Sequence, residues 1–546
     1  MDDRAKELIR CGDELFSKRS PLLSLWQTIA DQFYPERAEF TVTRTLGDEF
    51  ASHLNDSYPL IIRRELGDFL STLRRKDQEW FQVSVERDNL LDNGGKRFLE
   101  YATTVQRRAM YDRRSQFTKT MKEADHDFIT FGQPVLTIEP NFATNTLLYQ
   151  CWHLRDVVWS FTLDGRIAEV HRKWKPTARQ LAKLFEKKPG ASLHPQVSGK
   201  LEKDPYCEIE CRHVVVSIDD YEPEKRLKTQ AYTELYIDVA NQHVMYEAPL
   251  RNAKYVIPRW KTLSGTQYGH SPAVTVGLPD ARLIQAMSLT LLEAGEMAVR
   301  PPMAAKIDVI PAGAKLFAGG ITAIDAEYDG RIEDAIAPIM NDHRSLPFGL
   351  EILKDKQAML AQAFYIQKIN LPQFDHEMTA FEFSQRLQEY IRNVIPLFEP
   401  IESEYHAQVC DQTFQVLLEV NAFGDPRMFP RSVRGQETTF QFDSPLSQAV
   451  EREKGQRFLE AKSLVDQAVA YDPACSSIVD WRTSLRDALD GKRTPAKWLR
   501  SEAEVEKYAQ SVQQQQQLQQ QIQLAQQGGE AGQAVGAAQQ AINAAA

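Results

Sequence analysis

Cysteine is scarce in this 546-residue chain, and the few that occur are spread along its whole length. Small disulfide-stabilised domains instead pack closely spaced cysteines into a short chain. We therefore expect a reducing compartment and no structural disulfides among Cys11, Cys151, Cys207, Cys211, Cys410 and Cys475.

An excess of positive charge is also lacking, because 75 acidic residues outnumber 65 basic ones and leave a net charge of -10. Proteins that grip nucleic acid through a broad basic face have the opposite balance. Any contact with DNA should therefore be local or loose.

Long apolar runs are absent. A membrane-spanning helix needs about 18 or more apolar residues, and the best candidate, residues 286–299, is interrupted by Glu293 and Glu296. The first residues, Met1-Asp2-Asp3-Arg4, do not begin the apolar core of a signal peptide. We expect a soluble protein that works without a membrane.

Motifs for nucleotide binding and catalysis are missing as well. The sequence has neither Gly-x-x-x-x-Gly-Lys-Ser/Thr nor Gly-x-Ser-x-Gly, so we expect no enzyme activity, no catalytic residues and no cofactor. Cys207, Cys211 and His213 share one face of an expected strand, which allows either a zinc site or ordinary packed cysteines. No second paired-ligand motif lies nearby, so packing is favoured and no metal is expected.

The length exceeds the roughly 250–300 residues at which one core stops growing, and the pattern predicts an α+β, predominantly helical protein of two or more packed units. Two apolar stripes at helical spacing open the chain: one follows Ser20-Pro21, a plausible cap and first-turn proline, and one follows Pro59. A longer helical stretch is expected over residues 90–129. The stripes consist of Trp26, Ile29, Ala30 and Phe33, and of Ile62, Leu66, Phe69, Leu70 and Leu73.

The period of the apolar pattern changes toward two between residues 133 and 258, which is typical of strands. Asp164-Gly165 provides a hairpin turn, and one helix is expected over residues 178–187. The predicted strands are residues 80–85, 134–139, 147–153, 157–163, 208–218, 231–239 and 243–248.

Helical pattern returns after Pro272 and continues to Val299, where Pro301-Pro302 stops it. A glycine- and alanine-rich excursion then precedes a second helix, expected over residues 347–369. A long helical stretch over residues 378–420 should bend at Pro396 and Pro400. Residues 444–508 are helix-rich, and the remaining tail is rich in glutamine.

Two motifs in sequence order are the most specific feature of the chain. The first comprises residues 255–260 (YVIPRW), 268–273 (YGHSPA) and 278–282 (LPDAR), and the second is Met378-Thr379-Ala380-Phe381-Glu382 followed by Arg386. Both resemble the signatures of the portal proteins, the head-to-tail connectors of short-tailed bacteriophages. Weaker similarity, including Phe131-Gly132 before a strand, extends the resemblance to roughly residues 20–505.

The resemblance implies a dodecameric ring at one capsid vertex and a characteristic division of the subunit. It places a mixed α/β wing at 1–271, stem helices at 272–300 and 346–369, a clip at 301–345, a tunnel loop at 370–377, a long kinked helix and wing return at 378–440, and a helical crown at 441–508. For the glutamine-rich tail at 509–546, a barrel helix and disorder remain open alternatives.

The resemblance also implies partners: other copies of the chain, double-stranded DNA passing through the channel, a terminase, the major capsid and scaffolding proteins, and a tail adaptor. The protein would belong to the virion at the head-to-tail junction, after assembly in the host cytoplasm. Another virion structural ring or a tail-adaptor protein is the main alternative, and a packaging nuclease is a third.

Isolated cations on the expected stem helices are candidates for transient phosphate contacts, although solvated or ion-paired roles are the commoner alternative. The expected tunnel loop is the other candidate channel element. The cations are Lys354, Lys356, Lys368, Arg282 and Arg300, and the loop residues are Asn370, Leu371, Pro372, Gln373, Phe374, Asp375 and His376.

Overall fold

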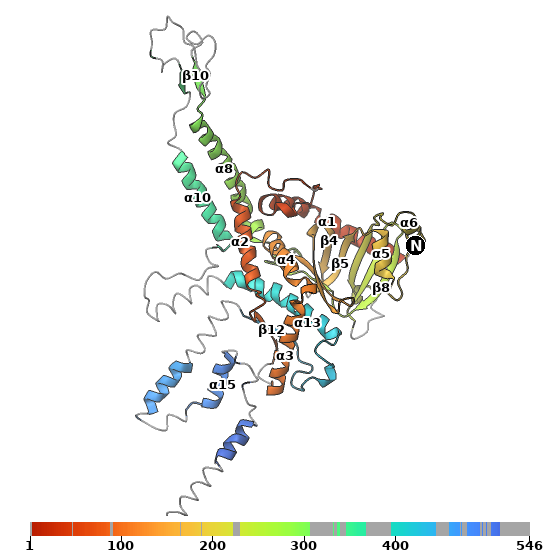
Figure 1. Ribbon diagram of the computed structural model, residues 1–546, viewed down its shortest axis with the longest axis vertical. Helices are drawn as coiled ribbons and strands as arrows, with labels where there is room; N and C mark the ends of the chain where they lie inside the picture. The colour runs from red at the N-terminus through yellow and green to blue at the C-terminus, as the bar shows by residue number, and fades with distance from the viewer. Residues whose placement is uncertain are drawn as a thin grey trace, which may run out of the picture. The chain divides into compact units, whose positions relative to one another are not determined.

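The computed structural model describes residues 3–45, 47–87, 91–163, 165–186, 188–221, 230–305, 331, 336–338, 346–366, 395–443, 458–469, 471, 478–491, 494, 498 and 504–513. They fall into two compact units, as the length predicts. The first unit comprises Met1–Trp80 and Gln106–Val420, and the second comprises Phe81–Val105 and Asn421–Ala546. Figure 1 shows the helices and strands of each.

The first helix of the first unit, α1 (Asp3–Phe33), is longer than the sequence predicts. Its predicted apolar stripe is buried, but the expected start at Ser20-Pro21 is wrong, because Pro21 lies inside the helix. A proline removes one backbone hydrogen bond, and packing on both sides of Pro21 offsets this loss. The Arg19 guanidinium, only 2% exposed, donates to the carbonyl oxygens of Leu154 and Val157.

The helical stretch predicted over residues 90–129 is two helices, α3 (Asn93–Met110) and α4 (Phe117–Phe131). The break has a local cause. The carboxylate of Asp112 accepts a hydrogen bond from the Arg114 backbone at 2.9 Å and caps a short 3-10 turn, and Gln116 then adopts a left-handed φ of 59°. α2 (Tyr58–Thr72) buries most of the second predicted stripe.

A five-stranded antiparallel sheet forms one part of the first unit, with its strands in chain order. They are β4 (Val157–Phe161), β5 (Ile167–Trp174), β6 (Cys211–Ser217), β7 (Tyr232–Asp238) and β8 (His243–Leu250). The start of α1 covers one face through Ala5, Leu8 and Ile9. On the other face, α5 (Ala178–Phe185) and α6 (Pro195–Lys203) cover a second apolar cluster.

Cys211 lies inside that second cluster and Cys207 packs against it, which is the packing alternative favoured by the sequence. Burial raises the pKa of the Cys211 thiol to about 12. The neutral thiol is therefore strongly favoured over the thiolate at neutral pH.

A three-stranded antiparallel sheet has the order β3 (Thr146–Trp152), β2 (Val135–Asn141) and β9 (Tyr255–Val256). It brings the first residues of the YVIPRW motif beside the strand that follows Phe131-Gly132. These two segments, far apart in the sequence, are thus neighbours in the fold.

After β9 a π-helical turn, Ala273–Gly277, leads into α8 (Leu278–Val299), then β10 (Met303–Ala305), β11 (Ile336–Pro338) and α10 (Leu346–Ala363). β10 and β11 pair antiparallel. α10 ends before the predicted limit of residue 369, because Tyr365 takes a left-handed φ of 60°. A second π-helix, Pro400–His406, begins at one of the two prolines expected to disturb the helix and continues into α13 (Ala407–Glu419).

The second unit contains the antiparallel pair of β1 (Phe81–Val85) and β12 (Thr438–Phe442). The residues of α3 up to Val105 belong to it. Helical segments follow at 458–469, α15 (Trp481–Gly491) and 504–513. The first two lie within the region predicted to be helix-rich, and the third extends past its limit at residue 508. Within the described ranges, none of the helices has both the length and the apolar character needed to cross a membrane.

Candidate functional site: the helix pair and its joint

α8 and α10 lie side by side and antiparallel, and they project from the rest of the first unit with β10 and β11 at their far end (Figure 1). We call these two helices the helix pair. Gly349 allows close approach near the start of α10, since a Cβ there would lie 2.9 Å from the Leu291 side chain. At its base, the ring of Phe364 packs 5.4 Å from that of Phe33 at the end of α1.

The base of the helix pair is held by what we call the joint, residues 130–133 and 259–271. Gly132 has φ +85°, and a Cβ on it would lie 2.7 Å from the backbone nitrogen of Ser271. A Cβ on Gly269 would lie 2.4 Å from the Gly132 carbonyl oxygen. The two backbones therefore touch directly, which only glycine permits at these positions.

Hydrogen bonds complete the joint. The Trp260 amide donates to the Gly132 carbonyl at 2.8 Å, and the Gly269 amide donates to Oε1 of Gln133 at 2.6 Å. The Ser271 hydroxyl donates to the Thr130 carbonyl at 2.7 Å. The signature motif thus fixes the segment that leads into α8 against the end of α4.

A buried polar chain ties the start of the same motif to the five-stranded sheet. Arg172 donates to the Tyr255 hydroxyl at 3.2 Å, and Tyr255 lies 2.6 Å from Nδ1 of His213. His213 Nε2 is 2.8 Å from Glu234, which also receives the Lys254 ammonium at 2.7 Å. Although burial opposes it, these two neighbours hold the pKa of Glu234 well below its ordinary value. Burial lowers the pKa of His213, so it stays neutral.

The predicted channel cations lie on different sides of the helix pair. At about 100° per residue, Arg282 points roughly opposite to Leu291, which faces α10. Arg300 lies just past the end of α8, where the backbone is no longer helical. Both arginines are exposed, as is Lys354 on the outer side of α10. Lys356 faces inward instead, and its ammonium lies 4.0 Å from Asp280 on α8. Lys368 and the predicted tunnel loop, residues 370–376, lie outside the described residues.

Large apolar side chains remain exposed on the helix pair. Leu292 is 60% exposed, Val299 81% and Phe348 66%. The same helices also expose Leu283, Leu289, Met297, Leu350 and Met359. Exposed apolar side chains grouped on one element are typical of a surface that contacts another molecule.

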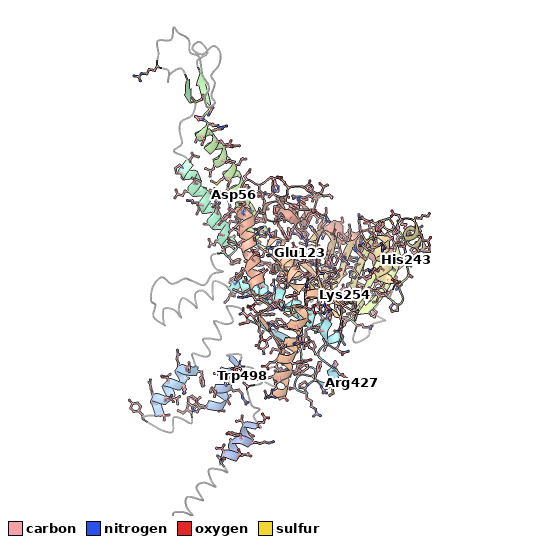
Figure 2. The ribbon with its side chains drawn as sticks, viewed as in Figure 1. Asp56, Glu123, His243, Lys254, Arg427 and Trp498 are labelled. Atoms are coloured by element: carbon pink, nitrogen blue, oxygen red, sulfur yellow. The ribbon has the colours of Figure 1, made fainter. Side chains whose placement is uncertain are left out.

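A polar contact that sequence reasoning missed joins a loop before α2 to both helices of the pair. Asp56, labelled in Figure 2, accepts from Ser288 on α8 at 2.8 Å and from Gln357 on α10 at 3.4 Å. The sequence gives no signal for this role, because Asp56 contacts residues more than 200 positions away along the chain. The part of the chain that the structure describes contains no cluster of three or more metal-ligating side chains.

Comparison with known proteins identifies the class to which this arrangement belongs. Residues 5–499 match the family described as bacteriophage head to tail connecting protein. The chain belongs to this family, which confirms the resemblance on which the sequence prediction rests.

The chain is similar to the probable portal protein of Bordetella phage BPP-1, with 22% identity over 455 residues that cover 81% of this chain and 79% of that protein. Among solved structures, it is similar to a chain in the virion of a native gene transfer agent particle, with a TM-score of 0.36, 9% identity, and coverage of 75% and 86%. A chain in the neck of an empty particle of that type gives a TM-score of 0.36, 10% identity, and coverage of 79% and 89%.

Proposed function

We propose that copies of this chain close into a portal ring at one capsid vertex, and that the helix pair forms the wall of a channel for packaging and ejection of double-stranded DNA. The main observation that supports this proposal is that the helix pair exposes apolar side chains on two opposite flanks. In a ring built from heterologous contacts, each copy has two different neighbours and needs two different faces.

The two flanks follow from helical geometry. At about 100° per residue, Leu283 and Met297 lie about 40° apart on one side of α8, and Leu292 and Val299 lie about 20° apart on the other. α10 repeats the pattern, with Phe348 on one side and Leu350 roughly opposite. A closed ring would cover both flanks of every copy, which favours it over a pair of copies or a free monomer.

Within this ring the segments take the roles that family resemblance implies. The helix pair would be the stem, residues 301–345 the clip at its far end, residues 370–377 the tunnel loop, and residues 441–508 the crown. Residues 1–271 would form the wing, and residues 378–440 the long kinked helix and the wing return. The antiparallel course of α8 and α10, with β10 paired to β11 beyond them, supports this assignment.

The outward cations divide into two sets of which only one can line the channel. Arg282 points away from α10, whereas Lys354 points away from α8, so these two face opposite sides of the helix pair. Arg300 lies just past the end of α8. The 4.0 Å approach of the Lys356 ammonium to Asp280 supports the ion-paired alternative for Lys356. A channel with few cations suits sliding DNA, because tight neutralisation of phosphate would hold it in place.

The protein would act without catalysis of its own. An ATP-driven terminase would dock on the ring during packaging, and a tail adaptor would later take its place. Capsid and scaffolding proteins would surround the ring in the host cytoplasm, and the finished ring would remain in the virion at the head-to-tail junction. Another virion ring or a tail adaptor is the alternative, and the family match favours the connector.

Single-flank variants test the ring directly. Leu292→Asp and Met297→Asp alter opposite flanks of α8, and each should reduce closed rings roughly 10-fold or more, as measured by mass photometry and electron microscopy. A mixture of the two should form dimers, because only the intact flank of one can meet the intact flank of the other. Arg282→Ala, on the outward polar face, is the matched control and should assemble normally.

Two outcomes would contradict the proposal. A wild-type chain that stays monomeric under all assembly conditions would exclude the ring. Full rings from either Asp variant alone would show that the two flanks of α8 are not the contact surfaces. Reconstruction of the virion around its tail axis then distinguishes a portal from another ring.

A further inference from the structure

The loop before α2 meets the helix pair through an arrangement that we call the clamp, made of Asn55, Asp56, Gln285, Ser288 and Gln357. One carboxylate oxygen of Asp56 accepts from the backbone of Tyr58 at 2.8 Å at the start of α2. The other accepts from Ser288 on α8 and Gln357 on α10. A single side chain therefore connects three helices.

Gln285 supplies the second half of the clamp. Its Oε1 accepts from the backbone nitrogens of Asn55 at 2.7 Å and Asp56 at 2.9 Å, and its Nε2 donates to the Asp56 carbonyl at 2.7 Å. The side chain is only 8% exposed. A glutamate in its place would lose the donor and would carry a charge into a buried position beside Asp56.

The clamp lies at the middle of α8, which continues past Ser288 for 11 residues. That length is about 16 Å at 1.5 Å per residue, so a rotation of about 10° at the clamp moves the end of the helix by about 3 Å. The polar contacts are directional, unlike the apolar packing below them at Phe33 and Phe364. They are therefore suited to fixing an angle.

We propose that Asp56 and Gln285 set the angle at which the helix pair leaves the rest of the first unit, and that this angle determines how many copies close the ring. The inference rests on the proposed ring. Neighbouring copies in a ring of twelve differ by about 30° and in a ring of thirteen by about 28°. A change of a few degrees in each copy is thus enough to alter the subunit count.

The test combines an angle measurement with a subunit count. Spin labels carried by noncanonical residues at exposed positions 64 on α2 and 293 on α8 report the distance within one chain, with labelled chains diluted in unlabelled ones. Gln285→Met removes three hydrogen bonds at similar volume, and Asp56→Asn keeps the shape but loses the charge. Asp68→Asn, whose carboxylate lies 3.2 Å from Lys122 on the exposed side of α2, is the matched control.

Both clamp variants should broaden the distance distribution by about 3 Å and spread the subunit count over two or more values by native mass spectrometry, with the circular dichroism spectrum unchanged. The control should match the wild type. Clamp variants with the wild-type distance distribution and subunit count would overturn the inference, as would a broadened distance with an unchanged count. If the wild type forms no ring, the proposed function is wrong. The distance measurement still tests the clamp in that case, and an unbroadened distance distribution in the clamp variants would overturn it.

Discussion

Replacing Gly132 by alanine should destabilise the first unit strongly, because the joint leaves no room for a side chain there. The new Cβ would lie 2.7 Å from the backbone nitrogen of Ser271, 2.8 Å from the carbonyl carbon of His270 and 2.9 Å from that of Gly269. All three atoms belong to the backbone, so no side-chain rotation relieves the contact.

Three contributions set the magnitude. A φ of +85° at a residue with a Cβ costs about 1–2 kcal/mol, and forcing extra volume into a packed site costs about 1–3 kcal/mol. Moving the segments apart also weakens the bonds from Trp260 and Gly269, worth about 0.5–1.5 kcal/mol each. We expect a loss of roughly 3–6 kcal/mol in the free energy of unfolding.

Gly165 provides a control with nearly the same φ. Its φ is +79°, but nothing lies within 4 Å of a Cβ built there. Gly165→Ala should therefore cost only the conformational part, about 1–2 kcal/mol. Urea unfolding followed by far-UV circular dichroism compares the two variants, and equal midpoints would refute the steric reasoning about the joint.

Two further predictions concern buried charge. The Arg74 guanidinium donates to both carboxylate oxygens of Asp125 in the core, and it also lies 2.8 Å from Nε2 of His406. Asp125→Ala should cost about 3–5 kcal/mol because it leaves the guanidinium buried without its carboxylate. Combining Arg74→Met with Asp125→Leu should recover most of that loss in thermal melts, and a double variant no more stable than Asp125→Ala would contradict this account. Burial lowers the pKa of His126 to about 4 and of His153 to about 3, from 6.5. As the pH falls from 6.5 toward 3, these histidines become protonated in the unfolded chain before they do so in the folded chain. The free energy of unfolding is therefore highest above pH 6.5 and decreases toward pH 3, by up to about 1.4 kcal/mol per pH unit for each histidine. Burial also raises the pKa of Asp127 to about 6, so this carboxyl stabilises the folded chain as the pH falls from 6 to 3.8 and opposes the effect of the histidines. His153→Gln should reduce the slope of the free energy of unfolding against pH in acid, and an unchanged slope would contradict the assignment.

Local patterns were sufficient to predict most strands and helices of the first unit. The strands predicted between residues 134 and 248 correspond to β2, β3, β4, β6, β7 and β8, because runs rich in β-branched and aromatic residues favour strands. The errors also have local causes. Pro21 is tolerated inside a helix held on both sides, and Asp112 caps a turn in what looked like one long helix.

The contacts that position the helix pair could not be predicted in this way. Asp56 and Gln285 are 229 residues apart, and a polar pair at that separation leaves no periodic pattern in the sequence. Gly132 and Gly269 similarly acquire their role only when two segments meet. The apolar flanks were partly foreseeable, since residues 272–299 have more apolar positions than one partner helix can cover.

The joint and the outward faces of the helix pair differ in which side chains they can accept. Gly132 and Gly269 touch backbone to backbone, so a single methyl group is too large. Arg282 and Lys354 are exposed, and a role in transient phosphate contact would require only charge at roughly the right position. The signature motif therefore identifies how the base of the helix pair is held, and not which side chains would meet DNA in the proposed ring. It follows that the YGHSPA residues should matter for folding and assembly before any DNA is present, whereas changes at the outward cations should leave assembly intact and alter only the passage of DNA.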